Sequence, residues 1–276
     1  MFSIQTNVAS LYAQQNMNVN SAFQATTINR LSSGYRINSS ADDAAGLAVA
    51  NGLRSERTEL TQGIRNGNDA ISQLQIADGG MNNISQILDR MKTLVTQGAS
   101  ATFTGDYGTL DSEFQSLMTE VTRQATNIGL DSAGGFAKSL SIYIGGGLGS
   151  NNAQIGTTTE TVDLSTAKVD ATGLSLSGAL TDAAASTTAI GVIQAAVKAL
   201  GTAQGLVGAG INTLNFAVGL AQSQVTNYAA DESRIRDADI ASEAANLSKS
   251  QTLTQASMAA LAQANQSTQS VLKLLQ

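Results

Sequence analysis

Cysteine, histidine, tryptophan and proline are all absent from this chain of 276 residues. Without histidine and cysteine, the chain lacks the commonest general base, the thiolate nucleophile and the usual zinc ligands. The absence of cysteine also excludes disulfide bonds and thiol redox chemistry. Proline breaks helix interiors, so a chain without it can form long uninterrupted helices. These absences predict a protein that is not an enzyme and that holds no cofactor or metal.

Basic surfaces and long apolar runs are also missing. The net charge of −6 and the pI near 4.6 argue against binding to the phosphate backbone of nucleic acids. No run approaches about 18 consecutive apolar residues, so we expect no membrane insertion. The first residues, Met1 to Asn7, lack the basic and apolar segments of a cleavable signal peptide. We therefore expect a protein that stays in the cytoplasm or leaves the cell by a route without such a signal.

Charged residues avoid both ends of the chain. None occurs before Arg30, and none lies between Lys249 and Lys273. The C-terminal end nevertheless shows the alternating 3-4 spacing of a heptad seam. One seam comprises Ala244, Leu247, Gln251, Thr254, Met258, Leu261, Asn265, Thr268, Leu272 and Leu275. A second comprises Leu253, Ser257, Ala260, Ala264, Ser267, Val271 and Leu274. A shorter N-terminal stripe comprises Ile4, Val8, Leu11, Val19, Ala22 and Phe23.

These terminal segments mix aliphatic residues with glutamine, threonine, serine and asparagine. A helix of this kind buries too little apolar area to be stable alone. Many copies around one axis would repel each other if each carried the same buried charge, so uncharged ends suit a symmetric assembly. The alternative is a loose polar tail at each end, but disordered tails usually carry net charge and lack aliphatic periodicity. We expect the ends to be disordered in the monomer and helical in a polymer.

Three further helical stretches are predicted in the body of the chain. The first opens at a capping box, with Ser40 as N-cap and Asp43 three residues later, and runs for about 55 residues to Gly98. Its apolar stripe comprises Ile64, Ile71, Leu74, Met81, Ile84, Leu88, Met91 and Val95. The second stripe comprises Leu110, Phe114, Leu117, Val121, Ala125 and Ile128. The third comprises Ile190, Ile193, Val197, Leu200, Gln204, Val207, Ile211, Leu214, Val218, Ala221, Val225 and Tyr228.

A different pattern occupies residues 139–185. Alternating β-formers at 141–144 and the threonine-rich run 157–164 predict two strands of a hairpin. The intervening Gly145 to Gly147 fits no phosphate-binding motif and is predicted to be a turn or loop. The sequence therefore predicts a mainly α fold with long antiparallel helices, a coiled coil formed by the N- and C-terminal segments, and a small β-hairpin. The predicted domains are 1–43 with 233–276, 44–138 with 186–232, and the hairpin region 139–185.

Two motifs resemble a known family. Residues 31–46 (LSSGYRINSSADDAAG) resemble the N-terminal signature of bacterial flagellins, and residues 233–243 (SRIRDADIASE) resemble their C-terminal signature. The second continues into 261–266 (LAQANQ) and 271–275 (VLKLL), so the resemblance covers about residues 1–100 and 205–276. The middle segment is too short for the large outer domains of many flagellins, which indicates a minimal form. The loop at 123–130 and the terminal Gln276 depart from the family pattern.

The resemblance implies a structural subunit that polymerises into the helical flagellar filament for swimming motility. Its terminal helices would fold and pack together on assembly around a central export channel. Implied partners are other copies of the chain, the filament cap, hook-filament junction proteins and a cytoplasmic chaperone that holds the C-terminal helix. The resemblance also implies an extracellular location, reached through flagellar type III export without a cleavable signal peptide. The alternatives are a coiled-coil adhesin or a junction protein; a metalloprotease insert would need HExxH and therefore histidine.

Three groups of candidate site residues follow. The inner assembly seam comprises Ile4, Val8, Leu11, Leu247, Leu253, Met258, Leu261, Val271, Leu272 and Leu275. The interdomain cap and turn comprise Gly34, Asn38, Ser40, Asp42 and Asp43. Arg90, Leu94 and Glu113 resemble positions that the innate flagellin receptor of animals contacts in some family members; the alternative is a solvated face that packs between subunits. The hairpin region's Thr157–Thr161 and Ser175–Ser177 could accept O-linked sugars, although threonine is also a good strand former.

Overall fold

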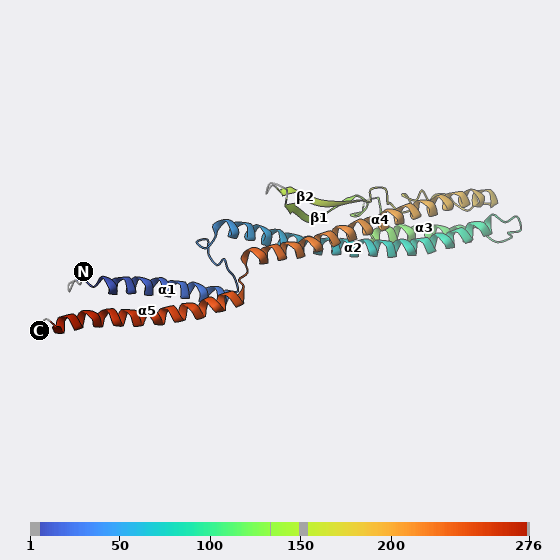
Figure 1. Cartoon of the computed structure of the whole chain (residues 1–276). Helices are drawn as coiled ribbons and strands as arrows, with labels where there is room; N and C mark the ends of the chain where they lie inside the picture. The colour runs from blue at the N-terminus through green and yellow to red at the C-terminus, as the bar shows by residue number, and fades with distance from the viewer. Residues whose placement is uncertain (1–5, 133, 149–153, 275–276) are drawn as a thin grey trace. The chain divides into compact units, whose positions relative to one another are not determined.

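A computed structural model describes residues 6–132, 134–148 and 154–274 of the chain (Figure 1). The elements, in order, are α1 (Val8–Ser33), α2 (Ala44–Gly98), α3 (Tyr107–Asn127), β1 (Ser139–Leu148), β2 (Gln154–Asp163), α4 (Ala183–Arg236) and α5 (Ile240–Leu274). The prediction of a mainly helical fold with a small antiparallel hairpin in mid-chain is confirmed. The chain divides into two compact units, which we call unit 1 (Met1–Ser55 with Asn227–Gln276) and unit 2 (Glu56–Thr226).

Unit 1 is built on the pair of helices α1 and α5, which lie side by side and run in opposite directions (Figure 1). The side chain of Asn7 caps the start of α1 by accepting a hydrogen bond from the Ser10 amide at 3.1 Å. Gly34 ends the helix in the left-handed conformation, with φ of 75°, and its amide donates to the Arg30 carbonyl at 2.9 Å. Glycine is the residue that adopts this conformation without steric cost. The predicted pairing of the two terminal segments is therefore present in a single chain.

Unit 2 has a conventional apolar core between α2, α3 and α4. Seven of the eight residues in the predicted α2 stripe are buried; Ile64 is half-buried. The largest fully buried side chains include Phe114, Met81, Ile84, Leu88 and Met91. Periodic apolar residues predicted this core because a helix in a globular unit turns its apolar stripe inward.

The predicted stripe of α4 is wrong at alternate positions between Ile190 and Leu214, whereas Val218 and Ala221 are buried as predicted. Ile193, Leu200, Val207 and Leu214 are buried as predicted. The residues buried between them are small, namely Ala189, Ala196, Ala203 and Gly210, in place of Ile190, Val197, Gln204 and Ile211. Small residues let neighbouring backbone approach closely. A Cβ atom added at Gly210 would lie 2.4 Å from the Val162 side chain of β2.

The glycine run of the hairpin corrects one prediction. Gly145 to Gly147, predicted as a turn or loop, belong to strand β1, which extends to Leu148. The strands pair antiparallel from Ser139 opposite Asp163 onward, and the register is irregular around this run. Glycines inside a strand commonly mark such irregularities, so the run bends the strand without ending it.

The hairpin packs directly on the backbone of α2. A Cβ atom added at Gly63 would lie 1.6 Å from the Ile144 carbonyl oxygen, so only glycine allows this contact. The Asn66 side chain donates to the Tyr143 carbonyl at 3.0 Å, and the Tyr143 hydroxyl donates to Glu59. One glycine and two polar contacts therefore fix the hairpin on the helix.

Helix α4 is long and apolar enough to cross a membrane by length and composition, and in the described part of the chain it is the one helix that meets this test. No membrane insertion was predicted because the sequence has no run of about 18 consecutive apolar residues. Helix α4 instead mixes apolar with small residues and has no charged residue between Lys198 and Asp231. Core helices of soluble proteins pass the same test. Only 28% of the most apolar stretch of α4 is buried, however, so much of this stretch faces outward.

Candidate functional site

The contact between α1 and α5 is made by small and polar side chains. Its buried members on α1 are Ala13 and Thr27, and those on α5 are Glu243 and Ser250. The half-buried residues between them continue the same line; they are Met17, Asn20 and Gln24 on α1 and Leu247, Thr254, Ser257, Leu261 and Ala264 on α5. Two hydroxyl groups of the seam are satisfied within α5: the Ser250 hydroxyl donates to the Leu247 carbonyl at 2.8 Å, and the Thr254 hydroxyl donates to the Ser250 carbonyl at 2.8 Å. Little apolar area is therefore buried between the two helices.

Three polar contacts link the two helices along their length. The Asn7 amide side chain donates to the Ala264 carbonyl at 2.9 Å. The Ser10 hydroxyl donates to the side chain of Asn265 at 3.1 Å. Near the middle of α1, the Asn20 side chain donates to the Ser257 hydroxyl at 3.0 Å. These contacts depend on which residues face each other, so they define one antiparallel register.

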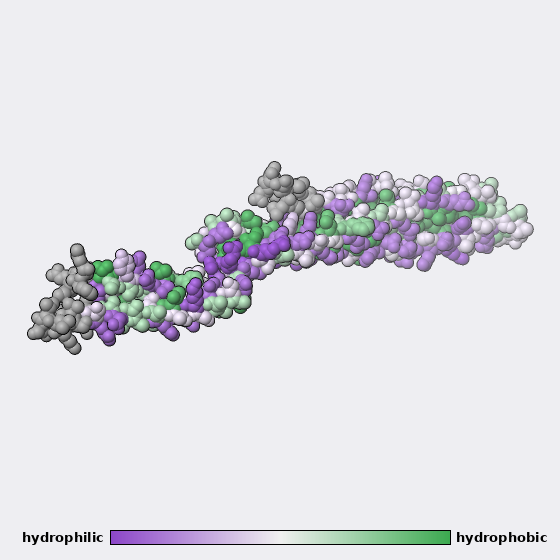
Figure 2. Space-filling model, viewed as in Figure 1, coloured by the Kyte–Doolittle hydropathy of each residue, from purple (hydrophilic) through white to green (hydrophobic). Residues whose placement is uncertain are grey.

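The large apolar side chains of unit 1 lie on the outside of the α1–α5 pair (Figure 2). On α1 the exposed apolar residues are Val8, Leu11, Tyr12, Val19, Phe23 and Ile28, and on α5 they are Ile240, Leu253 and Met258. We call this set the outer apolar surface. More than half of the Leu11 and Val8 surface is exposed, at 54% and 53%. Polar residues on the inside and apolar residues on the outside reverse the usual arrangement of a monomeric protein.

The predicted assembly seam divides accordingly. Val8, Leu11, Leu253 and Met258 belong to the outer apolar surface, whereas Leu247 and Leu261 are half-buried against α1. Val271 and Leu272 lie within α5, but their side chains are outside the described part. Ile4 and Leu275 lie outside the described residues altogether. The structure thus shows which of these residues meet within one chain, and contacts between chains stay a prediction.

The turn between α1 and α2 corrects the predicted cap. Helix α2 begins at Ala44, and Asp43 is its N-cap, because its carboxylate accepts from the Gly46 amide at 2.9 Å. Ser40, the predicted N-cap, lies in the preceding turn. The carboxylate of Asp42 fastens that turn by accepting from the Ser39 amide at 2.8 Å and the Asn38 amide at 3.1 Å. Aspartate and serine are equally common N-cap residues, so the sequence alone did not distinguish Ser40 from Asp43.

Hydrogen bonding fixes the charge of Asp42. The Ser39 amide, then the Ser39 hydroxyl and the Asn38 amide, lower the pKa of the Asp42 carboxyl below its ordinary value of 3.8. Asn38 contributes a second contact, since its side chain donates to the Ser33 hydroxyl at 3.0 Å. The turn therefore holds the end of α1 against the start of α2 through side chains of the signature motif.

A short backbone bridge joins this turn to the end of α4. Tyr35 pairs antiparallel with Asp237, the Arg36 amide donates to the Arg236 carbonyl at 2.6 Å, and the Ala238 amide donates to the Gly34 carbonyl at 2.9 Å. The guanidinium of Arg236 lies 4.1 Å from the centre of the Tyr35 ring. Cation–π stacking at this distance is favourable. The two family-like motifs therefore meet within unit 1.

Arg30 and Glu243 form an ion pair across the α1–α5 seam. The Arg30 guanidinium donates to the Glu243 carboxylate at 3.4 Å, and Glu243 is 8% exposed. Arg30 Nε and Glu243 Oε2 are buried and have no hydrogen-bond partner among the described residues. Arg30 is the one charged residue of α1. The pairing of these two residues was not predicted from the sequence; the position of Arg30 as the first charged residue of the chain was the available signal.

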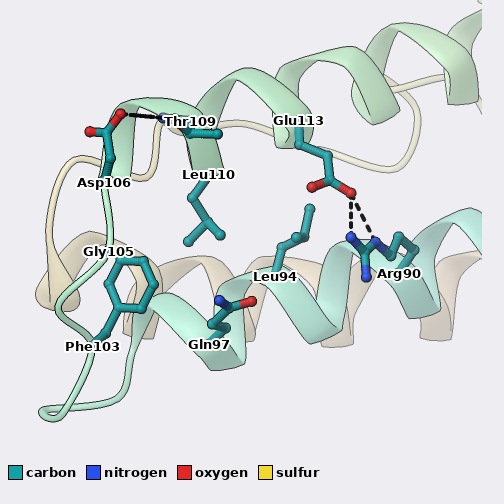
Figure 3. Close-up of a pocket in the computed structure, with 9 residues that line it drawn as sticks. All are labelled: Arg90, Leu94, Gln97, Phe103, Gly105, Asp106, Thr109, Leu110 and Glu113. Carbon is teal, nitrogen blue, oxygen red and sulfur yellow. Dashed lines mark hydrogen bonds and ion pairs between the residues drawn. The ribbon is translucent and has the colours of Figure 1, made fainter.

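In unit 2, Arg90, Leu94 and Glu113 line a hollow of about 450 Å³ between α2 and α3 (Figure 3). Arg90 donates twice to one oxygen of Glu113, at 2.9 and 2.6 Å. Leu94 is 2% exposed, so its side chain forms the floor rather than the rim. Asp106 caps α3 and accepts from the Thr109 hydroxyl, which lowers the pKa of the Asp106 carboxyl.

Glu56 and Tyr143 have raised pKa values where the hairpin packs on α2. Burial, followed by the nearby Glu59 charge, raises the pKa of Glu56, and the hydrogen bond to Glu59 raises the pKa of Tyr143. These groups belong to the contact between the hairpin and α2. Within the described residues, no group of three or more acidic side chains could hold a metal ion.

Comparisons with known proteins agree on one family. The model of the bacterial flagellin N-terminal helical region matches residues 4–131, and that of the C-terminal helical region matches residues 190–275. The flagellins of Halalkalibacterium halodurans and Listeria monocytogenes are 34% and 33% identical to this chain, with 99% of each chain covered. The flagellar filament 33 kDa core protein of Treponema phagedenis is 32% identical with the same coverage.

A crystal structure of Bacillus cereus flagellin is 28% identical, with a TM-score of 0.47, and the match covers 61% of this chain and 94% of that chain. The family assignment depends on the sequence matches, which extend over nearly the full length. The chain therefore belongs to the bacterial flagellin family: it is a structural protein that polymerises into an extracellular flagellar filament, and it is not an enzyme.

Proposed function

We propose that the α1–α5 pair is the inner, filament-core part of the subunit and that it becomes stable on assembly, when neighbouring copies cover its outer apolar surface. The observation that carries this proposal is the reversal of polarity in unit 1, where Leu11, Val19 and Met258 face outward. A fully buried leucine or valine contributes about 1.5–3 kcal/mol, so covering this surface would supply most of the driving force. Polymerisation would then be coupled to folding of the ends, around a central export channel.

The proposed domain boundaries follow from this assignment. The inner domain comprises 1–43 and 233–276, and the surrounding helical domain comprises 44–138 and 186–232 with the hairpin region 139–185. The turn residues Gly34, Asn38, Asp42 and Asp43 hold the end of α1 and the start of α2 together. We assign them a role in connecting the two domains, in support of which the bridge from Tyr35 to Asp237 lies beside them.

Seeded polymerisation tests the core proposal. Purified monomer mixed with short filament fragments should grow into long helical filaments visible by electron microscopy. A chain lacking residues 250–276 should fail to grow, while circular dichroism shows that the helices of unit 2 remain folded. Normal growth of the truncated chain would contradict a role for the α1–α5 pair in assembly.

Other partners are assigned to the same surfaces. Before assembly, the exposed side of α5, with Ile240, Leu253 and Met258, would be covered by a cytoplasmic export chaperone. The subunit would leave the cell unfolded through flagellar type III export without a cleaved signal peptide, and it would join the filament between junction proteins and the cap. N-terminal sequencing of filament subunits tests the export route, because an uncleaved chain begins at its encoded start.

The hollow at Arg90 supports a second assignment. Arg90 and Glu113 are both exposed and paired, and they lie at the rim above Leu94. We assign these residues to contact with the innate flagellin receptor of animals. The double variant Arg90→Ala and Glu113→Ala should lose signalling in a receptor-reporter assay, whereas Lys198→Ala on α4 should not. A wild-type monomer that gives no response would end this assignment.

A further inference from the structure

Apart from the three polar contacts made by Asn7, Ser10 and Asn20, the seam between α1 and α5 contains few features that distinguish one register from another. Its small side chains, such as Ala13, Thr27 and Ser250, would fit almost equally well after a slip of one heptad. In paired helices, single polar or charged residues commonly specify the register when the surrounding seam does not. The structure has one such charged contact across the described part of the seam, between Arg30 and Glu243.

We propose that the Arg30–Glu243 ion pair sets the register in which α1 and α5 associate in the filament. The proposal rests on the proposed function, in which the α1–α5 pair forms the filament core. These two residues thereby act as positioning residues for the outer apolar surface, because that surface is composed of side chains from both helices. A slip of one heptad would move the α1 and α5 halves of the surface by roughly 10 Å relative to each other.

The surroundings of the pair support this role. Glu243 is only 8% exposed, so an unpaired carboxylate there is strongly disfavoured. A slip of seven residues places Glu243 opposite Phe23 in one direction and, in the other, at the level of Ile37, beyond the end of α1. The first slip also places Arg30 opposite Arg236. Both slips replace an attractive contact by an uncompensated charge or a repulsion.

The neighbouring backbone bridge cannot make the same selection. Hydrogen bonds between the backbones of Tyr35 and Asp237, or of Arg36 and Arg236, involve groups that every residue here carries. Backbone hydrogen bonds form equally well in several registers, so side-chain contacts determine which register is adopted. The Arg30–Glu243 contact lies about one and a half turns of helix from this bridge and, together with the stacking of Arg236 on Tyr35, adds sequence-specific contacts.

Cysteine cross-linking can measure the register directly because the chain contains no cysteine of its own. The in-register reporter combines Asn20→Cys with Ser257→Cys. In the observed register the Asn20 side-chain nitrogen lies 3.0 Å from the Ser257 hydroxyl oxygen, so the two positions face each other. Two slipped reporters combine Asn20→Cys with either Ser250→Cys or Ala264→Cys, one for each direction of slip.

The reporters are measured in filaments. A small share of each double-cysteine chain is copolymerised with the cysteine-free chain, so that cross-links form within subunits rather than between them. Filaments are then oxidised, and the cross-linked fraction is measured by non-reducing electrophoresis. The ratio of in-register to slipped cross-linking is the quantity compared between variants.

In the parent background, the in-register reporter should cross-link efficiently and both slipped reporters should cross-link poorly. Adding Glu243→Gln or Arg30→Gln should reduce the ratio of in-register to slipped cross-linking by roughly tenfold. The exchanged pair, Arg30→Glu with Glu243→Arg, should restore the ratio. Lys249→Gln removes an exposed charge from the same helix and should leave it unchanged.

The possible failures are distinguishable. If the cysteine-free parent grows no filaments, or if the in-register reporter does not cross-link in them, the proposed function itself is wrong. If the parent behaves as expected but the Glu243→Gln and Arg30→Gln filaments keep the same cross-linking ratio, only the register proposal is overturned. A loss of the ratio that the exchanged pair does not restore would also overturn it, because it would indicate general destabilisation.

Discussion

The two units of this chain reach a paired-helix structure by opposite distributions of apolar residues. Unit 2 buries Met81, Leu88 and Phe114 completely and exposes few large apolar side chains. In its α1–α5 pair, unit 1 buries Ala13, Thr27 and Ser250 and exposes large apolar side chains such as Leu11 and Val19. The difference indicates that unit 2 is stabilised by its own core, and it supports the proposal that unit 1 is stabilised by surfaces of neighbouring copies.

The largest expected effect breaks the core of unit 2. Phe114→Ala removes a fully buried ring and should lower the free energy of unfolding by about 3–5 kcal/mol. The measurement is chemical denaturation of the monomer followed by circular dichroism. The matched control is Phe216→Ala, at a side chain that is 80% exposed, which should change stability by about 0.5 kcal/mol or less. Equal losses for both variants would contradict the assignment of the core.

The outer apolar surface of unit 1 should respond in the opposite way. Leu11→Ser should leave monomer stability unchanged, because the side chain is largely exposed. It should raise the critical concentration for polymerisation roughly tenfold or more, since the buried leucine is lost from the polymer. Sedimentation of seeded filaments gives this concentration. Gln15→Ser, at an exposed polar position of the same helix, is the control; a similar rise there would remove the distinction between the two faces.

A smaller effect is expected where the hairpin rests on α2. Gly63→Ala places a methyl group where the Ile144 carbonyl lies, so the hairpin must shift, at a cost of about 1–3 kcal/mol. Hydrogen exchange should show lost protection in β1 and β2. Gly79→Ala on the same helix meets nothing within 4 Å and should raise stability by up to about 1 kcal/mol. Unchanged strand protection in the Gly63→Ala variant would show that the hairpin is held elsewhere.

The smallest effect concerns the turn before α2. The pKa of Asp42 is lowered in the folded chain, so its contribution is present above the ordinary value of 3.8 and is lost as the pH falls through the lowered pKa. Exchange protection of the Ser39 amide should therefore decline on acidification, and Asp42→Asn should reduce it at neutral pH as well. Protection that is independent of pH would mean that the backbone alone holds the turn.

The sequence predicted the core of unit 2 better than the contacts of unit 1. In α2, Ile71, Leu74 and Met81 are large, periodic and buried, so apolar spacing was sufficient. In the terminal segments, apolar spacing selected Val8 and Leu11 as seam residues. The contact between α1 and α5 within one chain is made by neighbours such as Ala13 and Asn20. Periodicity identifies a face, but it cannot tell which of two faces is covered by the same chain.

Smaller differences have local causes. The N-cap of α2 is Asp43 rather than the predicted Ser40, because both residue types cap helices and they lie three positions apart. In α4, burial of Ala196 and Ala203 instead of Val197 and Gln204 reflects close packing, which a hydrophobicity pattern does not encode. The ion pair between Arg90 and Glu113 joins α2 to α3, so it could be identified only once the packing of these helices was known.

The polarity of the α1–α5 pair has a consequence for tolerance to mutation. In unit 2, exposed positions are free to vary and buried ones are constrained, as in most globular proteins. In unit 1 the seam is constrained by pairing, and in the proposed filament the outer face is constrained by neighbouring copies, so neither face of α1 would be free. Tyr12 and Val19 are exposed in a single chain, yet few substitutions at these positions would then preserve filament assembly. A saturation screen for swimming cells should find the two terminal helices less variable than the exposed faces of α3 and α4.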